Sequence, residues 1–323
     1  MSPILFGGVV RIFACFIMFT LAGCMDNSPP QISIGANVWP GYEPLFLGRE
    51  KGYYQKLNVK LVEYRSASQV IDGLRSGLID MAALTLDEAI KVKSNGTPLK
   101  IILIFDISDG ADALVAAAEY DAISKLKGKK IGIEHSALGA YFFQRFIDIN
   151  QLKREDFQLI GVDIDGHLQA IERQQVDAVV TFEPVKSKIL RRGGHVLFDS
   201  SVLPNEIIDV LVVTDVGYQR IGKEAIQNFI NQYWQAASSF IKSPKQNYQL
   251  INKRLKLSPE ELHYTYQQLH IPDINEQLSI MAHDGLGQKT VDNYNQVLLD
   301  MGLIEQKCDC SELFDPRFIE AIK

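Results

Sequence analysis

From Ile32 onward, two hydrophobic periods alternate along the chain. Stretches that are apolar at every second position, or apolar throughout, predict β-strands, whereas apolar residues three and four positions apart predict helices. The first set of predicted strands covers residues 32–36, 59–64, 79–84 and 99–105, and the helices between them cover 42–51, 66–77 and 87–94.

A second set of strands and helices follows the first. Its strands cover residues 130–133, 157–162, 177–181, 196–198 and 210–214, and its helices cover 138–150, 167–174 and 185–192. After Thr214 the pattern changes to long amphipathic helices such as 223–242, with no further clear strand. Alternation of strands and helices with short connections predicts an α/β protein with mainly parallel sheets.

The two sets predict two lobes. If a leader of 23 residues is removed from the 323, the remaining chain still exceeds what one hydrophobic core usually supports. We expect a first lobe from residues 32–110 plus 213–323 and a second lobe inserted at 111–212. Ligands of open α/β sheets bind beyond the carboxyl ends of the strands, so two such lobes predict a ligand cleft between them.

The first residues have the pattern of an export signal. An apolar stretch, 12–22, follows Arg11 and ends on Leu-Ala-Gly-Cys24. A charged segment, an apolar segment and small residues are the three parts of a secretory signal peptide. The alternative is a transmembrane anchor over residues 3–23, because that length nearly spans a bilayer. Val10 is a further hypothesis for the true start, since it would give the signal an ordinary charged beginning.

Leu21-Ala22-Gly23-Cys24 resembles the lipobox of bacterial lipoproteins. The resemblance implies a signal peptide at 1–23, a diacylglyceryl group on Cys24, a linker at 24–31 and a chain anchored to a membrane through acyl chains such as palmitate. Asp26 is displaced by one position from where an aspartate usually retains a lipoprotein at the inner membrane. The choice between the inner and the outer membrane stays open.

Composition excludes several classes of function. A net charge of −6 without a basic cluster argues against nucleic acid, and 46% hydrophobic with 22% charged residues is typical of a globular domain. Beyond the lipobox, the cysteines are Cys308 and Cys310. Cys-Asp-Cys is too close for an easy disulfide and lacks nearby histidines for a metal, so we interpret the pair as thiols in a mobile tail.

Motifs of covalent catalysis are missing. The chain has no Gly-x-Ser-x-Gly, no His-Glu-x-x-His, no Walker A motif and no Gly-x-Gly-x-x-Gly, and its six histidines are scattered. Polar or aromatic residues instead follow the predicted strands, and several of these loops open helices. The free N–H groups of a helix N-terminus can bind an anion, and Thr85 and Ser136 are placed to add a hydroxyl donor.

Four segments carry a family resemblance. They are residues 34–54, 71–88, 126–132 and 176–184. Together they resemble the nitrate/sulfonate/taurine and thiamine-precursor group of ABC-transporter solute-binding proteins, over about residues 32–240. The resemblance implies a type II periplasmic-binding-protein fold, with two lobes on a hinge that close on a small molecule and deliver it to a permease.

The same resemblance implies a set of ligand-binding residues. It places Trp39 and Tyr42 in an aromatic wall, Thr85 and Asp87 at the edge of the first lobe, Asp106 near the hinge, Ser136, Leu138 and Gly139 at a helix N-terminus of the second lobe, Glu183 after a late strand and Asp209 on the return crossing. The alternatives are simple packing for the two aromatic residues, interlobe hydrogen bonds for Glu183 and Asp209, and a structural role for Asp106.

The acidic residues of this set indicate the charge of the ligand. Asp106, Glu183 and Asp209 are all candidates to face the cleft, and the matched loops contain no arginine. An isolated sulfonate or nitrate prefers arginine and helix N-termini to carboxylates. We therefore hypothesise a ligand with an amino group, either a thiamine-precursor pyrimidine or a zwitterion such as taurine.

The predicted function is an extracytoplasmic, monomeric solute-binding lipoprotein that serves an ABC permease and its ATPase. It needs no metal and no other cofactor, and it is not an enzyme. One alternative is a sensor of the same fold that is not coupled to a permease. Another is an enzyme, because a eukaryotic branch of the superfamily makes the thiamine pyrimidine. That branch relies on a cysteine cluster, which this chain lacks.

Overall fold

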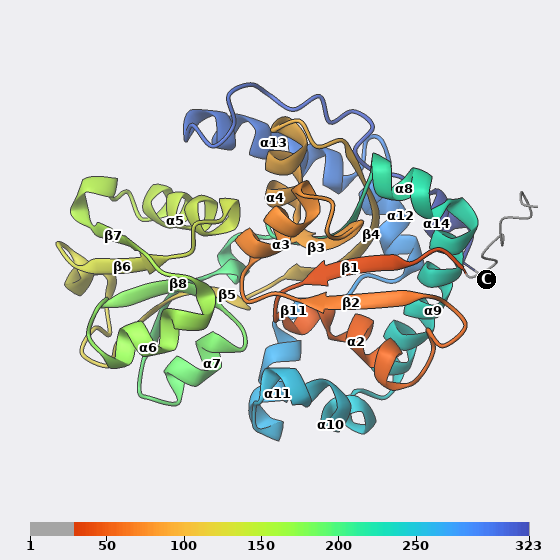
Figure 1. The fold of residues 1–323 in the computed structure, drawn as a ribbon. Coiled ribbons are helices and arrows are strands. Elements are labelled where there is room, and N and C mark those ends of the chain that lie inside the picture. The colour runs from red at the N-terminus through yellow and green to blue at the C-terminus, as the bar shows by residue number, and fades with distance from the viewer. Residues whose placement is uncertain (1–28, 323) are drawn as a thin grey trace, which may run out of the picture.

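The computed structural model describes residues 29–322, which form two mixed sheets that lie side by side, each covered by helices (Figure 1). The first sheet has six strands in the order β11-β4-β10-β3-β1-β2. These strands are β1 (Ile32–Ala36), β2 (Val59–Glu63), β3 (Met81–Thr85), β4 (Leu99–Ser108), β10 (Ile208–Thr214) and β11 (Leu269–His270).

The second sheet has five strands in the order β7-β6-β8-β5-β9. They are β5 (Asp112–Ala116), β6 (Lys130–Ile133), β7 (Gln158–Gly161), β8 (Ala178–Phe182) and β9 (His195–Asp199). We call the first sheet with its helices the first lobe, and the second sheet with its helices the second lobe.

The helices fill the connections and the C-terminal part. Figure 1 shows α3, α4 and α13 on one side of the first sheet and α2, α10 and α11 on the other. The α-helices are α2 (Glu43–Glu50), α3 (Ala67–Arg75), α4 (Leu86–Ser94), α5 (Ala137–Ile149), α6 (His167–Glu172), α7 (Val185–Leu190), α8 (Asp215–Ile221), α9 (Lys223–Lys242), α10 (Pro244–Leu255), α11 (Pro259–Gln267), α12 (Ile274–Met281), α13 (Leu286–Asp300) and α14 (Arg317–Glu320). Short 3-10 turns are η1 (Pro40–Tyr42), η2 (Ile123–Leu126), η3 (Arg154–Asp156), η4 (Ile164–Gly166) and η5 (Ser200–Val202).

The prediction of mainly parallel sheets is wrong. In the first sheet β1 pairs in parallel with β2 and β3, but β10 runs antiparallel to β3 and β4, and β11 antiparallel to β4. In the second sheet β5 runs antiparallel to both β8 and β9. The antiparallel strands β4, β5 and β10 adjoin the connections between the lobes, so their direction is set by where the chain crosses and not by local periodicity.

Strand membership also corrects the expected lobe boundary and two strand predictions. The division at 212/213 cuts through β10, which lies wholly in the first sheet, so the chain returns to the first lobe before Ile208. The sequence prediction has no strand at β5 and none after Thr214, where β11 adds two residues to the edge of the first sheet.

Hydrogen bonds tie the connections between the lobes together. The hydroxyl of Ser108, at the end of β4, lies 2.8 Å from that of Ser200 in the return segment. Ser200 Oγ also accepts a 2.7 Å hydrogen bond from the backbone N–H of Gly110. Each sheet has its own core cluster, and Ala137 and Tyr141 of α5 in the second lobe also pack into the core of the first, so the lobes touch beside these crossings.

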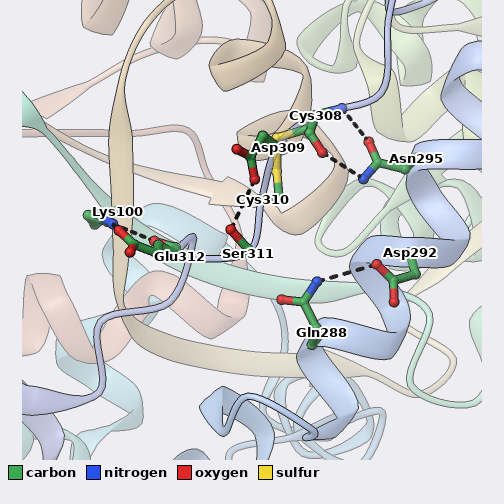
Figure 2. The surroundings of a disulfide bond; sticks show 9 residues. All are labelled: Lys100, Gln288, Asp292, Asn295, Cys308, Asp309, Cys310, Ser311 and Glu312. Carbon is green, nitrogen blue, oxygen red and sulfur yellow. Dashed lines mark hydrogen bonds and ion pairs between the residues drawn. A yellow bond between two sulfur atoms is a disulfide. The ribbon is translucent and has the colours of Figure 1, made fainter.

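The C-terminal cysteines do not lie in a mobile tail. Cys308 and Cys310 form a disulfide, and Cys310 is buried (Figure 2). A bend in the chain brings their Cα atoms to 5.3 Å, inside the range that a disulfide bridges, although one residue separates them. The backbone of Cys308 exchanges two hydrogen bonds with the Asn295 side chain, and the following segment pairs with Ile101 of β4. This end of the chain is part of the first lobe.

Candidate ligand site between the lobes

Loops at the carboxyl ends of the strands converge on a small cavity between the lobes. The first lobe lines it with Asn37, Trp39, Tyr42, Ala67, Thr85, Glu88 and Asp209, and the second lobe with Asp112, Glu134, Leu138 and Phe182. Its volume of about 20 Å³ holds about one water molecule. A larger solute therefore enters only when the lobes or the lining side chains move apart.

An aromatic contact joins the lobes at this cavity. The ring of Trp39 meets that of Phe182 edge to face, with 5.5 Å between the centroids. On the first lobe, Tyr42 packs against Phe105 at 5.0 Å and donates its hydroxyl hydrogen to Asp209. Aromatic side chains give such a site a wall on which a planar or apolar part of a solute can pack.

Four carboxylates line the cavity, two from each lobe. Glu88 and Asp209 come from the first lobe, and Asp112 and Glu134 from the second. Each is at most 5% exposed, and one oxygen of Glu88 and one of Asp112 have no hydrogen-bond partner among the described residues. Unpaired buried carboxylate oxygens are costly, and they are acceptors for a donor that the protein itself does not supply.

Burial raises the pKa of these carboxyl groups. The pKa of Glu88 rises to about 8, and those of Asp112 and Glu134 rise to about 7, with desolvation as the main cause. Burial also raises the pKa of Asp209, and the neighbouring Asp106 adds to the rise. A cation placed among these groups would reverse this effect, because it favours their charged form.

No lysine or arginine lines the cavity among the described residues. Lys186 on α7, a buried cation of the second lobe, instead donates to the carbonyl oxygen of Gly110 at 2.6 Å and to the amide oxygen of Gln268. It thereby links the second lobe to the hinge and to the first lobe. The lining is therefore acidic without a basic side chain in it, and burial raises the pKa of Asp112 more than Lys186 lowers it from outside the lining.

Five of the ten predicted ligand residues line the cavity. These are Trp39, Tyr42, Thr85, Leu138 and Asp209. Their contact with a ligand stays a prediction, but their convergence from separate strands follows from the carboxyl ends meeting at one edge. Thr85 is also the N-cap residue of α4, where its backbone N–H donates a 3.1 Å hydrogen bond to the Glu88 carboxylate.

The other five predicted ligand residues do not line the cavity. Asp106 is buried behind Trp39 and accepts hydrogen bonds of 3.2 and 3.3 Å from its indole N–H. Asp87 is buried beside Glu88. Ser136 accepts a hydrogen bond from the N–H of Gly139 and caps α5, and Gly139 lets that helix pack closely on Ile133.

The expectation that Glu183 faces the cleft is wrong. Its carboxylate turns to α7, where it accepts hydrogen bonds from the N–H and hydroxyl of Ser187 at 3.1 and 2.9 Å. The residue satisfies the first turn of α7 within its own lobe, so these bonds are also not the interlobe hydrogen bonds of the predicted alternative.

Sequence reasoning missed six lining residues: Asn37, Ala67, Glu88, Asp112, Glu134 and Phe182. Asn37 and Glu134 directly follow β1 and β6, so a search that began one residue after each strand would have found both. Glu88 is the neighbour of the predicted Asp87. Asp112 and Phe182 sit on β5 and β8, and β5 was not predicted.

Substitution of Gly41 tests the packing of Asp106 against Trp39 behind the aromatic wall. A Cβ added there would lie 1.7 Å from Asp106 Oδ2 and 2.7 Å from the indole nitrogen of Trp39. We expect Gly41→Ala to lower the free energy of unfolding by about 1–3 kcal/mol and to displace Trp39. Urea denaturation and tryptophan fluorescence measure the two effects. Gly166→Ala is the control, since the nearest atom to its added Cβ is at 3.2 Å. Equal stability of both variants would contradict the packing described.

Two further structural findings bear on the site. Within residues 29–322 no helix is both long and apolar enough to cross a membrane. The predicted leader at 1–23 and Cys24 lie outside the described residues. The described part also has no group of three or more histidine, cysteine or acidic side chains arranged to hold a metal ion.

Comparison with known proteins places this geometry in a family. The NMT1/THI5-like family model matches residues 39–247, which include the loops of the first lobe and most of the second. A Brucella abortus (strain 2308) protein named as a binding protein is 22% identical over 242 residues, covering 73% of this chain and 75% of its own. A Saccharomyces cerevisiae 4-amino-5-hydroxymethyl-2-methylpyrimidine phosphate synthase, THI13, is 30% identical over 172 residues, about half of each chain.

Solved structures share the fold. The alkanesulfonate-binding protein SsuA from Xanthomonas axonopodis, bound to MOPS, aligns with a TM-score of 0.74 at 14% identity, over 89% of this chain and 99% of its own. The ligand-binding component of an ABC-type import system from Staphylococcus aureus aligns with a TM-score of 0.75 at 15% identity, over 91% and 99%. The predicted periplasmic-binding-protein fold is confirmed, and the chain belongs to the NMT1/THI5-like family.

Proposed function

We propose that this chain is the exported solute-binding protein of an ABC importer, and that it closes its lobes on a small solute carrying a protonated amine or an amino-substituted heterocycle. The observation that carries the proposal is the cavity between the lobes, with four carboxylates and no basic side chain among its lining residues. A carboxylate site with aromatic walls suits N–H donors and cations.

The acidic lining of this cavity makes it a poor site for a sulfonate, which is itself negatively charged. A sulfonate at this position would face Glu88, Asp112, Glu134 and Asp209 with no cation to offset them. Above pH 7 to 8, where Asp112, Glu134 and Glu88 lose their protons in turn, each ionised group about 4 Å from a sulfonate repels it by about 4 kcal/mol at the effective dielectric constant of a protein surface. The sulfonate-binding structures therefore support the fold and the binding mode, and the charge of the lining favours an amine.

An aminopyrimidine is one solute that fits this chemistry. The yeast relatives are named as synthases of an aminopyrimidine phosphate, so the family includes proteins that handle such a ring. An amino group on a planar ring can donate to carboxylates while the ring packs on Trp39 or Phe182. The missing catalytic motifs favour binding without turnover.

A hydrogen bond between the two lobes connects the cavity lining to closure of the lobes on the solute. Glu134 follows β6 in the second lobe, and its Oε1 accepts a 3.0 Å hydrogen bond from the N–H of Ala67, the first residue of α3 in the first lobe. Next to it, the hydroxyl of Ser68 donates to the carbonyl oxygen of His135 at 3.2 Å. Because Glu134 also lines the cavity, one side chain touches both the solute space and the opposite lobe.

Substitution of Glu134 tests this coupling. Glu134→Ala removes the acceptor for the Ala67 N–H, and we expect it to weaken solute binding about 10-fold and to reduce the compaction that the solute causes. Glu134→Gln keeps an amide oxygen at that place, so it should retain compaction better than the alanine variant. Calorimetry and small-angle X-ray scattering measure the two quantities. Equal compaction of the wild type and the alanine variant would show that this contact does not hold the closed state.

Export and anchoring complete the proposal. Leu21-Ala22-Gly23-Cys24 supports a lipid-anchored chain outside the cytoplasm, and a permease with its ATPase would receive the solute. A thermal-shift screen over amines, aminopyrimidines, sulfonates and nitrate tests the ligand class. A solute at a hundred times its Kd stabilises the protein by about 2.7 kcal/mol. We expect the shift with amines or aminopyrimidines, and a shift with sulfonate or nitrate alone would refute the assignment.

A further inference from the structure

The chain enters the first lobe at a fixed point. The carbonyl oxygen of Pro29 accepts a 3.3 Å hydrogen bond from the side chain of Asn58, and that of Gln31 accepts one of 2.7 Å from Arg220 on α8. Figure 1 shows this entry at the end of the first lobe that is far from the second lobe. The strand that follows, β1, points from there toward the cleft.

The two most exposed large apolar side chains lie beside this entry. Leu78 is 73% exposed and Val216 is 79% exposed, whereas other large apolar residues in the described part are at most 53% exposed. Val213 pairs with Met81 in antiparallel register, and the N–H of Thr214 donates to the carbonyl oxygen of Asp80, so α8 begins beside the segment that leads into β3.

Arg220 connects this pair to the entry point. It stands one helical turn after Val216 on α8 and forms a hydrogen bond of 3.0 Å with Asp80, two residues after Leu78. The guanidinium of Arg220 also donates the hydrogen bond to the carbonyl oxygen of Gln31. Leu78 and Val216 thus lie on two segments that Arg220 and its Asp80 partner join, and an exposed apolar surface of this kind suits contact with an apolar partner.

The tether from Cys24 is short. Five residue steps separate Cys24 from Pro29, which span at most about 18 Å when fully extended. The radius of gyration of a domain of this length is about 19 Å. An acyl group on Cys24 would therefore keep the entry point close to the bilayer, and the face around the entry would be the one nearest to the lipid.

We propose that Leu78 and Val216 form a contact with the lipid bilayer, which holds the anchored protein upright with its first lobe on the membrane. The inference rests on the proposed acylation of Cys24. The segments that carry Leu78 and Val216 also expose charges of both signs, Arg75, Asp215, Lys223 and Glu224, so neither sign dominates the proposed contact. The cleft lies at the opposite ends of the strands, so it stays in water in this orientation.

A fluorescent label tests the contact on the intact lipoprotein. The full chain is purified from membranes, acylation of Cys24 is checked by mass, and Leu78→Cys is labelled with NBD. The disulfide protects Cys308 and Cys310 from the reagent. The matched control is Ile160→Cys on β7, the outer strand of the second sheet, and Val216→Cys is a second test position. The proteins are reconstituted into phosphatidylcholine vesicles with or without doxyl-labelled phosphatidylcholine.

We expect blue-shifted emission and doxyl quenching at positions 78 and 216, and neither effect at position 160. Emission typical of water at 78 and 216 on an acylated chain would overturn the lipid contact while leaving the anchor intact. Equal quenching at all three positions would also overturn it, because it would show that no face is preferred. A chain without an acyl group at Cys24 would overturn the anchoring proposal and this inference together, and would leave the proposed solute site untouched.

Discussion

Asp112→Asn is expected to weaken binding of an amine-bearing solute by about 10²-fold, because it removes a charged acceptor from the cavity. Asp112 is 3% exposed, lines the cavity and has one oxygen without a partner among the described residues. Hydrogen bonds to charged groups contribute about 1.5–3 kcal/mol, which corresponds to roughly 10- to 150-fold in Kd. Calorimetry at pH 8, where the wild-type carboxylate is ionised, measures the loss.

The same substitution should stabilise the protein without solute. An unpaired carboxylate raises the free energy of the folded state, and asparagine has nearly the same shape without the charge. Glu172→Gln is the control, since it makes the same charge change in the same lobe on the surface of α6, where Glu172 pairs with Arg192. Unchanged affinity in Asp112→Asn, or an equal loss in the control, would contradict the role given to the cavity charge.

The second prediction concerns pH: the protein without solute should become more stable as pH falls from 9 to 6.5. The raised pKa values of Glu88 and Asp106, each about 8, and of Asp112 and Glu134, each about 7, mean that the folded state takes up protons in this range. The unfolded chain, with ordinary carboxyl pKa values, does not. Stability therefore falls as pH rises through the folded pKa values.

Each group that takes up a proton in this window adds about 1–2 kcal/mol, which is about 2–8 °C in Tm. Below pH 6.5 the effect is opposed by His167, whose pKa burial lowers to about 4, because the unfolded chain then binds the extra proton. Affinity for a cationic solute should run the other way and rise with pH, since the solute needs ionised carboxylates. Thermal denaturation at several pH values, with and without solute, tests both signs. A Tm that is flat or rises between pH 6.5 and 9 without solute would contradict the buried acidic cluster.

The hydrophobic periodicity of the sequence predicted those helices and strands whose formation depends mainly on neighbouring residues. β1, β6 and the long helix α9 have the predicted bounds, because their periods are clear and polar residues or glycine stand at their ends. β5 begins with the cavity residue Asp112 and contains two alanines, so it shows neither alternation nor a strong apolar run. Its place between β8 and β9, and that of β10 between β3 and β4, depend on pairing across the hinge.

The site, like the fold, has features that the local sequence predicts and features that depend on how the lobes pack. The sequence could place polar residues after strands, and half of the predicted ligand residues line the cavity. It could not decide between Asp87 and Glu88, because one step along α4 turns a side chain by about 100° away from the cleft. Nor could it separate Glu183, which is turned to α7, from Asp209, which reaches the cavity. Both follow or lie on strands, and only the packing of the lobes distinguishes them.

The fold is shared with proteins whose site residues need not resemble those of this chain. The sulfonate-binding neighbours share the architecture at 14–17% identity, and the fold leaves the lining residues free to differ. In this chain the lining is acidic and aromatic.

Calorimetry at pH 8 with a matched set of solutes tests the central claim most directly. Taurine and ethylamine carry an amino group, ethanesulfonate is taurine without it, and 4-amino-5-hydroxymethyl-2-methylpyrimidine carries it on a planar ring. We predict binding of at least one of the amino compounds, weakened in Asp112→Asn, and no binding of ethanesulfonate. Tight binding of ethanesulfonate, with no binding of any compound that carries an amino group, would contradict the account.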